Sequence, residues 1–228
     1  MKYGKIVIFG GSSGIGLATA EYLNDRCEEL ITLSRRPSPF GKWIKTDITN
    51  PAEIEKTTQE IGSGPIDGLL YLGGTWERNA FTDKYNFESC SDNDLQNVLD
   101  VNLLGPMRLI QKLLPNLRLA ENPKIIITGA AIAELSLGGG KEVANTSSML
   151  GLRGLVLALR ENVKEDKIGV TLLKPGYIAT PEVVKDFAET KTPMDYAIPL
   201  TDIFTIIESI LRLSNRTNIN EIEIPTML

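Results

Sequence analysis

The chain of 228 residues is 42% hydrophobic and 23% charged, and its formal net charge at pH 7 is −5. This length and composition suit one domain with a substantial core, and the negative charge argues against a surface for nucleic acid or an anionic membrane. The absence of histidine excludes Ser-His-Asp triads, histidine general bases and histidine-ligated metals.

The two cysteines, Cys27 and Cys90, form no metal-binding or redox spacing and are expected to be ordinary thiols in a reducing cytoplasm. No apolar run approaches the roughly 20 residues that cross a bilayer. The first predicted strand begins almost at Met1, so we expect no signal peptide before it. These features predict a cytoplasmic protein without a metal, nucleic-acid or membrane partner.

The stretch from Lys5 to Asn24 has the order strand, glycine turn, helix. Glycine is needed where a chain turns sharply or where its backbone approaches a ligand closely. A helix N-terminus that follows such a turn offers free N–H groups and a positive dipole end to a phosphate. The stretch therefore predicts a site for a dinucleotide pyrophosphate.

The glycine spacing G-x-x-x-G-x-G resembles that of the short-chain dehydrogenase/reductase family rather than the G-x-G-x-x-G of many other dehydrogenases. Phe9 stands where that family usually has threonine. The resemblance extends over essentially the whole chain and implies that the turn contacts the cofactor. The cofactor-binding residues expected there are Gly10, Ser12, Ser13, Gly14, Ile15 and Gly16.

Apolar strand-like runs alternate with helical patterns along the rest of the chain, which predicts parallel strands joined by crossover helices. No linker divides the chain, so residues 1–228 are predicted to form a single α/β domain, a Rossmann-like doubly wound parallel sheet with helices on both faces. Further strands are expected near 29–34, before residue 46, and over 67–74, 124–128, 169–174 and 220–225. Long helices are expected over 91–117 and 145–160, and a last helix from residue 201.

The second strand ends in Ser34, followed by Arg35 and Arg36. In dinucleotide-binding folds an acidic residue near this point binds the ribose 2′-OH, whereas arginine accommodates a 2′-phosphate. The pair therefore favours NADP(H) over NAD(H), and the alternative is a solvated surface pair. After the third strand, the resemblance places Asp47 and Ile48 beside the adenine.

Asn50, Pro51 and Glu53 form the N-cap, N1 and N3 positions of a predicted helix, which is a variant of the capping box. At the end of the fourth strand the family has Asn-Asn-Ala-Gly. This chain has Tyr71, Leu72, Gly73 and Gly74 there, and the two glycines are expected to keep the backbone open for the cofactor.

The segment after the sixth strand resembles the family's Pro-Gly segment around the nicotinamide. The residues expected to contact the cofactor there are Pro175, Gly176, Ile178 and Thr180. The resemblance implies a flexible substrate loop over 181–200. The polar and aromatic segment from Trp76 to Cys90 leaves the carboxyl edge of the sheet, where ligands bind. It is interpreted either as a pocket wall or lid, or as a loop packed on the core by its aromatic side chains.

In this family a serine polarises the substrate carbonyl, and a Tyr-x-x-x-Lys pair supplies the general acid and the charge that lowers its pKa. Alignment on Gly154 and Leu155 places Asn145 at the tyrosine position and Met149 at the lysine position. Ala131 occupies the serine position. No Tyr-x-x-x-Lys exists anywhere in the chain, so this absence does not depend on the alignment.

Asn102 matches the family's helix asparagine, which the resemblance associates with a water relay, and a purely structural role is equally open. Asn145 is able to donate a hydrogen bond, but an amide is not a proton donor near neutral pH. Lys141 and Glu142, just before the helix, are interpreted as a solvated loop pair. The candidate catalytic residues are therefore Asn102 and Asn145, and loss of a general acid typically lowers the rate by about 10²–10⁴-fold.

Three functions are compatible with a retained cofactor site and a lost acid. The first is an NADP(H)-dependent oxidoreductase that reduces an imine, an iminium or an activated double bond of a small molecule. The second is a catalytically degenerate NADP(H) sensor or partner subunit, and the third is a non-redox cyclase, isomerase or lyase in the same pocket. The resemblance also implies a homodimer or homotetramer formed through the helices at 91–117 and 145–160.

Overall fold

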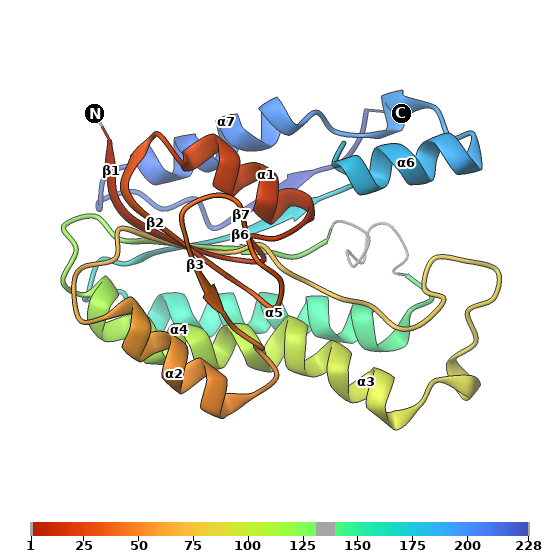
Figure 1. Ribbon diagram of the computed structural model, residues 1–228, viewed down its shortest axis with the longest axis horizontal. Coiled ribbons are helices and arrows are strands. Elements are labelled where there is room, and N and C mark those ends of the chain that lie inside the picture. The colour runs from red at the N-terminus through yellow and green to blue at the C-terminus, as the bar shows by residue number, and fades with distance from the viewer. Residues whose placement is uncertain (1, 131–139, 228) are drawn as a thin grey trace.

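The computed structural model describes residues 2–130 and 140–227. Within this part of the chain, a seven-stranded parallel sheet lies between two layers of helices, with strand order β3-β2-β1-β4-β5-β6-β7 (Figure 1). The direction of strand succession reverses between β1 and β4, which makes this a doubly wound, Rossmann-like sheet, as predicted. The strands are β1 Tyr3–Phe9, β2 Cys27–Ser34, β3 Lys42–Lys45, β4 Gly68–Tyr71, β5 Lys124–Thr128, β6 Gly169–Pro175 and β7 Glu221–Ile224.

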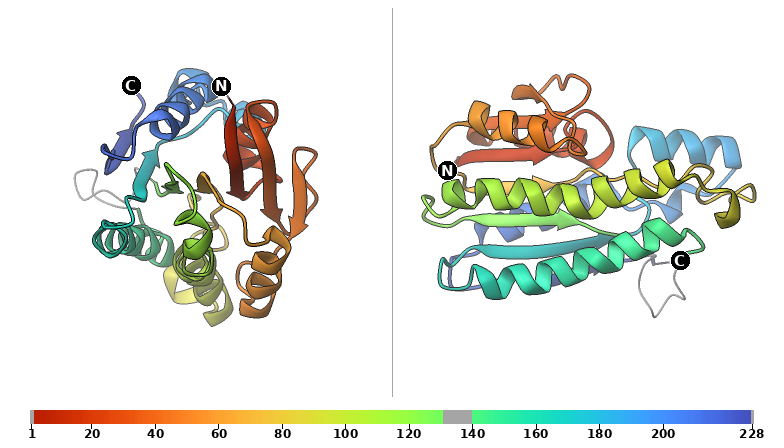
Figure 2. Two further views of the ribbon diagram at one scale, coloured as in Figure 1. Left: turned by 90° about the vertical axis from the view of Figure 1, so that its left-hand side faces the viewer. Right: turned by 90° about the horizontal axis from the view of Figure 1, so that it is seen from below.

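Helices cover both faces of the sheet (Figures 1 and 2). One layer contains α1 Gly14–Leu23 and α7 Leu200–Arg212. The other contains α2 Pro51–Ile61, α3 Asp92–Leu99, α4 Gly105–Leu117 and α5 Val143–Asn162. Helix α6 Pro181–Thr190 lies beyond the carboxyl ends of the strands, on the same side of the sheet as α1. No helix in the described residues is long and apolar enough to span a bilayer.

The core has two halves, one on each side of the sheet. Successive side chains of a strand point to opposite faces, so β1 contributes to both halves. Val7 and Phe9 pack in the cluster beneath α2, α4 and α5, whereas Ile6 and Ile8 pack in the cluster beneath α1 and α7. Burial on both faces explains why the central strands are continuous apolar runs.

Helix α2 begins as predicted. The Asn50 side chain accepts hydrogen bonds from the backbone N–H groups of Ala52 and Glu53, and Pro51 occupies the first helical position. The capping-box variant differs in one respect. The Glu53 carboxylate accepts the backbone N–H of Asp47, at 2.8 Å, and so ties the helix start to the preceding turn.

The long helix predicted over 91–117 is two helices joined by a π turn at Asp100–Leu104. A wider turn leaves a backbone carbonyl without its usual helical partner. The buried Tyr71 hydroxyl donates a hydrogen bond to the Val101 carbonyl within this turn. Gly105 follows because a Cβ there would lie 2.6 Å from Ile48 Cγ1 and 3.0 Å from the Tyr71 hydroxyl.

Residues 181–200, predicted as a loop, have regular structure. Thr180 caps α6 and Pro181 starts it, and a short helical turn follows at Met194–Tyr196. The end of this segment then pairs with the residues just before α6. Ile198 N–H donates to the Tyr177 carbonyl, and Ala179 N–H donates to the Ile198 carbonyl. The relation of this segment to a substrate stays a prediction.

Candidate cofactor-binding and active site

The glycine turn between β1 and α1 is shaped by close backbone approaches. Gly10 has a φ of +93°, and a Cβ on it would lie 2.8 Å from the backbone nitrogen of Gly73. A Cβ on Gly16 would lie 2.3 Å from the Gly10 carbonyl oxygen. Side chains at Gly10 and Gly16 would therefore push α1 away from the ends of β1 and β4, so both glycines are required by the geometry.

The N-terminus of α1 has no side-chain cap from its own N-cap residue, unlike the N-termini of α2 and α3. Ser13 precedes the helix with extended backbone and no side-chain cap, and no acidic residue lies in the first turn. By contrast, Asn50 and Ser91 cap α2 and α3 with their own side chains. A helix start without a local cap suits an anion from elsewhere, because its backbone N–H groups and dipole favour negative charge.

The ends of β1 and β4 carry two departures from the family pattern, and these are in contact. The ring of Phe9, at the family's threonine position, stacks on that of Tyr71 with centroids 4.5 Å apart and planes at 17°. Gly73 makes room for this pair, since a Cβ there would lie 2.5 Å from Phe9 Cε1. Burial raises the pKa of Tyr71 well above its ordinary value, so this phenol stays protonated.

The two arginines after β2 extend into solvent. Ser34 is buried, and its hydroxyl donates to the Arg36 carbonyl at 2.7 Å, which fixes the bend that follows the strand. Arg35 and Arg36 are exposed, and neither guanidinium forms an ion pair with the residues the structure describes. They follow the carboxyl end of β2, and a role in holding a 2′-phosphate stays a prediction.

Asp47 and Ile48 occupy the turn after β3. The Asp47 carboxylate accepts the backbone N–H and the hydroxyl of Thr49, at 3.0 and 2.8 Å, so the side chain is used within an Asx turn. Ile48 is buried in the core and touches the position where Gly105 lacks a side chain. A contact of these residues with adenine therefore stays a prediction.

The segment after β6 is bonded to the end of β7 at Gly176 and forms the start of α6 at Thr180. Gly176 N–H donates to the Ile224 carbonyl at 2.8 Å, and Ile178 is buried. Thr180 is also buried, and its hydroxyl accepts the Val183 N–H at 3.5 Å as the cap of α6. The predicted cofactor residues thus come from the carboxyl ends of β1, β2, β4 and β6 and from the turn after β3, which lie along one edge of the sheet (Figure 1).

Asn102 clamps the loop after β4 to α5. Its amide oxygen accepts the Thr75 N–H at 2.9 Å, and its Nδ2 donates to the Thr75 carbonyl at 2.7 Å and to the Ser148 hydroxyl at 3.0 Å. The side chain is 1% exposed. These bonds occupy the amide on both sides, which supports the structural alternative, while the relay role stays a prediction.

Asn145 and Met149 face the interior from α5. Asn145 is buried, and its Nδ2 makes a long hydrogen bond of 3.4 Å to the Thr75 carbonyl. Ser148 Oγ donates to the Asn145 carbonyl at 2.7 Å. Met149 is partly buried and packs against the core, so it supplies neither charge nor proton. Ala131, at the family's serine position, lies outside the described residues.

Glu77 is a site residue that sequence reasoning missed. Its carboxylate is 1% exposed and accepts the backbone N–H groups of Ala144, at 2.7 Å, and Asn145, at 3.2 and 3.3 Å. It also accepts the Tyr85 hydroxyl at 3.3 Å, and that hydroxyl in turn accepts the Val143 N–H at 3.0 Å. The acid of a distant loop therefore caps α5 at the helix turn that contains Asn145.

The segment from Trp76 to Cys90 is anchored by hydrogen bonds of Glu77 and Tyr85, and its other three aromatic side chains are exposed. Trp76, Phe81 and Phe87 are 58%, 44% and 47% exposed, which contradicts the alternative of a loop packed on the core by its aromatics. Trp76 and Phe81 contact each other edge to face at 5.7 Å. A wall or lid role stays a prediction.

Glu142 is not the solvated loop residue that the sequence suggested. It is buried, and its carboxylate accepts the Phe81 N–H at 2.7 Å. The donor belongs to the Trp76–Cys90 segment, 61 positions earlier in the chain, so the sequence around Glu142 gives no sign of this bond. Lys141 is exposed, as expected.

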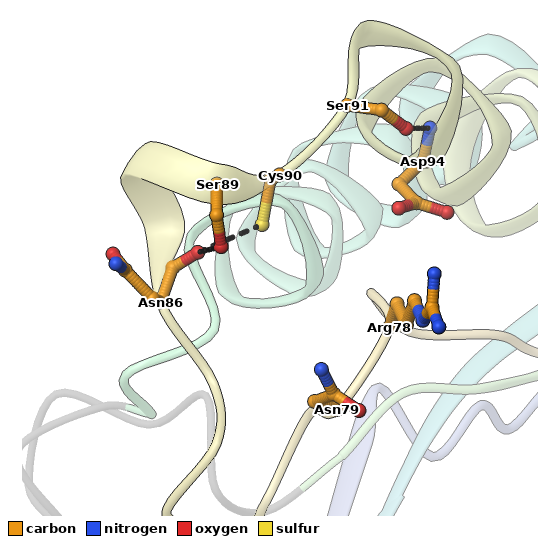
Figure 3. Close-up of a pocket in the computed structure, with 7 residues that line it drawn as sticks. All are labelled: Arg78, Asn79, Asn86, Ser89, Cys90, Ser91 and Asp94. Atoms are coloured by element: carbon orange, nitrogen blue, oxygen red, sulfur yellow. Dashed lines mark hydrogen bonds between the residues drawn. The ribbon is translucent and has the colours of Figure 1, made fainter.

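A small polar pocket of about 150 Å³ lies between this segment and the start of α3 (Figure 3). None of the residues predicted to bind cofactor lines it, and no cluster of three potential metal ligands occurs among the described residues. Its lining residues are Arg78, Asn79, Asn86, Ser89, Cys90, Ser91 and Asp94.

Comparison with known proteins identifies the family. The family described as short chain dehydrogenase matches residues 4–191. The chain is similar to the short chain dehydrogenase adrF of Penicillium roqueforti, with 28% identity over 185 residues that span 77% of this chain and 70% of that protein. It is similar to the carbonyl reductase family member 4 of Danio rerio, with 27% identity over 76% of this chain and 75% of that protein. In fold it resembles the Pseudomonas aeruginosa RhlG/NADP active-site complex, with a TM-score of 0.79 over 98% of this chain and 96% of that one, at 21% identity.

Proposed function

Because this chain belongs to the short-chain dehydrogenase/reductase family, a family of nicotinamide-dependent oxidoreductases, we propose that it is an NADP(H)-dependent reductase with a non-standard active site. Its proposed substrates are small molecules that carry an imine, an iminium or an activated carbon–carbon double bond. Alcohol and ketone interconversion is disfavoured because that chemistry needs a proton donor at the position of Asn145.

The residues present fit a dinucleotide. Gly10 and Gly16 allow the backbone segments of the turn to lie close to each other and to Gly73. The N-cap residue of α1 makes no side-chain cap. Arg35 and Arg36 would hold the 2′-phosphate, and Thr180 with the Pro175–Gly176 turn would border the nicotinamide. Bound there, the reduced nicotinamide would supply a hydride. The preference for NADP(H) over NAD(H) rests on the two arginines.

The observation that carries this proposal is the amide at the position of the family's proton donor. A hydride that adds to a ketone leaves negative charge on oxygen, which needs a proton or strong stabilisation. A hydride that adds to the carbon of an iminium moves the C=N π pair onto nitrogen and gives a neutral amine. The iminium reaction therefore needs no acid from the protein.

Asn145 has a defined part in this scheme. Among the described residues its Nδ2 has one hydrogen bond, a long one to the Thr75 carbonyl, and the amide would turn from this bond toward a polar group of the substrate. Asn102 and Glu77 keep Thr75 and the α5 N-terminus in place on either side of it. The proposed role of Asn145 is to orient the substrate by one hydrogen bond.

The direct test is NADPH oxidation with a cyclic iminium and with the ketone of the same ring. The proposal predicts steady turnover of the iminium, and turnover of the ketone that is slower by about the 10²–10⁴-fold value of a general acid. Equal turnover of the ketone would contradict it. Tight NADPH binding with no turnover of any imine or enone would instead identify the sensor alternative, and activity without a nicotinamide would identify the non-redox one.

The proposed setting is a reducing cytoplasm, where the free thiols of Cys27 and Cys90 persist. The proposed assembly is a homodimer or homotetramer. It is supported by three exposed apolar side chains spaced seven residues apart on α5, namely Val143, Leu150 and Leu157. Such spacing places them along one face of the helix.

A further inference from the structure

One backbone donor of the glycine turn is already occupied by an acid of the protein. Glu182 lies in the first turn of α6, and its Oε1 accepts the Gly14 N–H at 3.2 Å. The two residues are 168 positions apart in the chain. Gly14 is the first residue of α1, so this N–H belongs to the helix end that the proposed function assigns to the cofactor pyrophosphate.

The Glu182 side chain is held as an anion. Burial raises the pKa of its carboxyl, but hydrogen bonds from its own backbone N–H, from Gly14 and from Thr180, together with the nearby Arg36 guanidinium, outweigh this and leave the pKa below its usual value. At neutral pH a carboxylate therefore sits at the positive end of α1. An anion at an anion site is the arrangement expected of a competitor.

The geometry points to Glu182 as a determinant of cofactor affinity: we propose that its carboxylate competes with the pyrophosphate of the dinucleotide for the Gly14 N–H. This inference rests on the proposed cofactor. One N–H donor makes one strong hydrogen bond, and two anions so close repel each other. Glu182 must therefore leave Gly14 before a pyrophosphate takes its place.

The rest of α6 is fixed more firmly than this contact. Thr180 caps the helix, Phe187 is buried, and its ring contacts that of Tyr177 at 5.5 Å. The Glu182 side chain itself is on the exposed side of the helix start. Release of Gly14 thus requires a change of the side chain and leaves the anchoring of α6 intact, so substitution of Glu182 tests the competition without unfolding the helix.

The cofactor with more negative charge is expected to gain more when Glu182 is neutralised. Attraction to the Arg36 guanidinium is one of the causes that lower the pKa of the Glu182 carboxyl, although the two side chains form no ion pair among the described residues. Glu182→Gln removes this attraction and leaves the Arg36 charge for a 2′-phosphate. The variant should therefore bind NADPH more tightly by a larger factor than it binds NADH.

Calorimetric titration of Glu182→Gln tests the proposal, with NADPH, NADH and inorganic pyrophosphate as probes. Loss of one charged competitor predicts about three- to tenfold tighter binding of NADPH and of pyrophosphate. Glu189→Gln is the matched control, because it removes the same charge from the same helix at a side chain that is 66% exposed and faces Lys185. The control should bind all three probes as the wild type does.

The outcomes separate this inference from the proposed function. If the wild type binds NADPH and Glu182→Gln binds NADPH and pyrophosphate no more tightly, the competition is wrong and the cofactor proposal stands. If neither protein binds any nicotinamide but pyrophosphate binds Glu182→Gln more tightly, the competition stands and the cofactor proposal fails. If the variant gains affinity for no probe and nothing binds, both fail.

A second readout needs no ligand. In the free wild-type protein the Gly14 amide proton is bonded to a carboxylate, so we expect slow exchange with solvent and a downfield NMR shift. Glu182→Ala should speed this exchange, whereas Glu189→Gln should leave it unchanged. An identical Gly14 signal in the wild type and Glu182→Ala would overturn the contact on which the proposal depends.

Discussion

Phe9 and Tyr71 show that two departures from a family pattern form one structural unit. Each residue alone reads as the loss of a family residue, a threonine and an asparagine. In the structure the two rings stack, and Gly73 leaves the space that the Phe9 ring fills. The Tyr71 hydroxyl also satisfies a carbonyl of the π turn. At the carboxyl ends of β1 and β4 this chain therefore has an aromatic pair in place of the two family residues.

Restoring the family's acid tests whether Asn145 limits the chemistry. Asn145→Tyr combined with Met149→Lys supplies a phenol and the ammonium that lowers its pKa. We expect NADPH-dependent ketone reduction to rise by about 10²-fold or more, the value of a general acid. The assay is ketone reduction at saturating NADPH, after circular dichroism has shown that the variant is folded.

The control for this gain is Asn145→Phe combined with Met149→Lys, which differs by one hydroxyl. It should show no gain. A folded tyrosine variant that binds NADPH but reduces ketones no faster than this control would contradict the assignment of Asn145 to the proton-donor position.

The hydrogen bonds that Glu77 accepts at the α5 N-terminus are predicted to contribute to the free energy of unfolding. Glu77→Ala leaves the N–H groups of Ala144 and Asn145 and the Tyr85 hydroxyl without their acceptor. Because unsatisfied buried donors cost about 1–3 kcal/mol each and partial solvation recovers some of this, we expect a loss of about 2–3 kcal/mol in the free energy of unfolding. Urea unfolding measures it.

The matched control is Glu88→Ala, which removes an exposed acid from the same segment. It should change the unfolding free energy by less than about 0.5 kcal/mol. Equal changes in the free energy of unfolding for the two substitutions would show that the hydrogen bonds of Glu77 do not stabilise the protein.

At the scale of elements, β7 is joined to α5 and β6 by a cluster of charges. Glu221 pairs with Lys174 at 3.2 Å and with Arg153 at 3.2 Å, and Glu223 lies 3.7 Å from Lys174. Lys174 precedes the predicted nicotinamide segment, and its side chain is 8% exposed. The cluster thus fixes α5 and the Pro175–Gly176 turn relative to the edge of the sheet.

The pH dependence of stability reports on this cluster. Burial raises the pKa of Glu221, but hydrogen bonds from Lys174 and Arg153 and the charges of both outweigh it, so the folded-state pKa lies below the usual value. A depressed folded pKa stabilises the protein above the unfolded pKa, and this contribution is lost as pH falls through the folded pKa. We therefore expect Glu221→Gln to cost about 1–2 kcal/mol at pH 7 and progressively less below about pH 4.

Chemical unfolding at several pH values measures this difference, with Glu161→Gln as control. The Glu161 side chain is 79% exposed and pairs with Lys164, which follows the end of α5. A destabilisation by Glu221→Gln that stayed constant from pH 7 to pH 3 would contradict an electrostatic role.

How much of these elements the sequence predicts depends on the distance of the partners. The glycine turn and the Asn50 cap are local patterns, and both are present as predicted. Thr180, Pro181 and Glu182 are likewise an N-cap, a first-turn proline and a first-turn acid. These residues alone predict the start of α6, whereas the family resemblance predicts a loop there. Local chemistry was the better guide there.

Other features have no local signal. The Glu77 carboxylate accepts hydrogen bonds from backbone N–H groups 67 and 68 positions away. The Glu142 carboxylate accepts one from the Phe81 N–H, 61 positions away. An isolated acid in a polar loop reads as solvated until the fold brings its donors to it. The π turn is similar, because its extra residue is accommodated by the Tyr71 hydroxyl, which comes from a strand 30 positions earlier.

For the whole molecule, the apolar face of α5 predicts self-association. α4 and α5 run along one face of the structure (Figure 2). Leu150 and Leu157 are 39% and 52% exposed on α5. We expect Leu150→Glu combined with Leu157→Glu to shift the sedimenting species toward the monomer, because charges at the centre of an apolar interface are unfavourable.

Leu119→Glu is the control, since this side chain is 63% exposed beyond the end of α4. It should leave the sedimentation of the protein unchanged. A wild-type protein that sediments as a monomer at micromolar concentration would contradict the proposed assembly.

The central claim is that this chain moves hydride from NADPH to an acceptor that needs no protein acid. The most direct measurement follows deuterium from NADPH that carries deuterium at both C4 positions of the nicotinamide into a cyclic iminium, with mass detection of the amine. We expect an amine one mass unit heavier, formed at a rate that Asn145→Ala lowers through substrate binding. With an N-alkylated iminium, which has no N–H proton to lose, the rate should change little between pH 6 and pH 9. Bound NADPH with no deuterium in the amine at saturating iminium would contradict it.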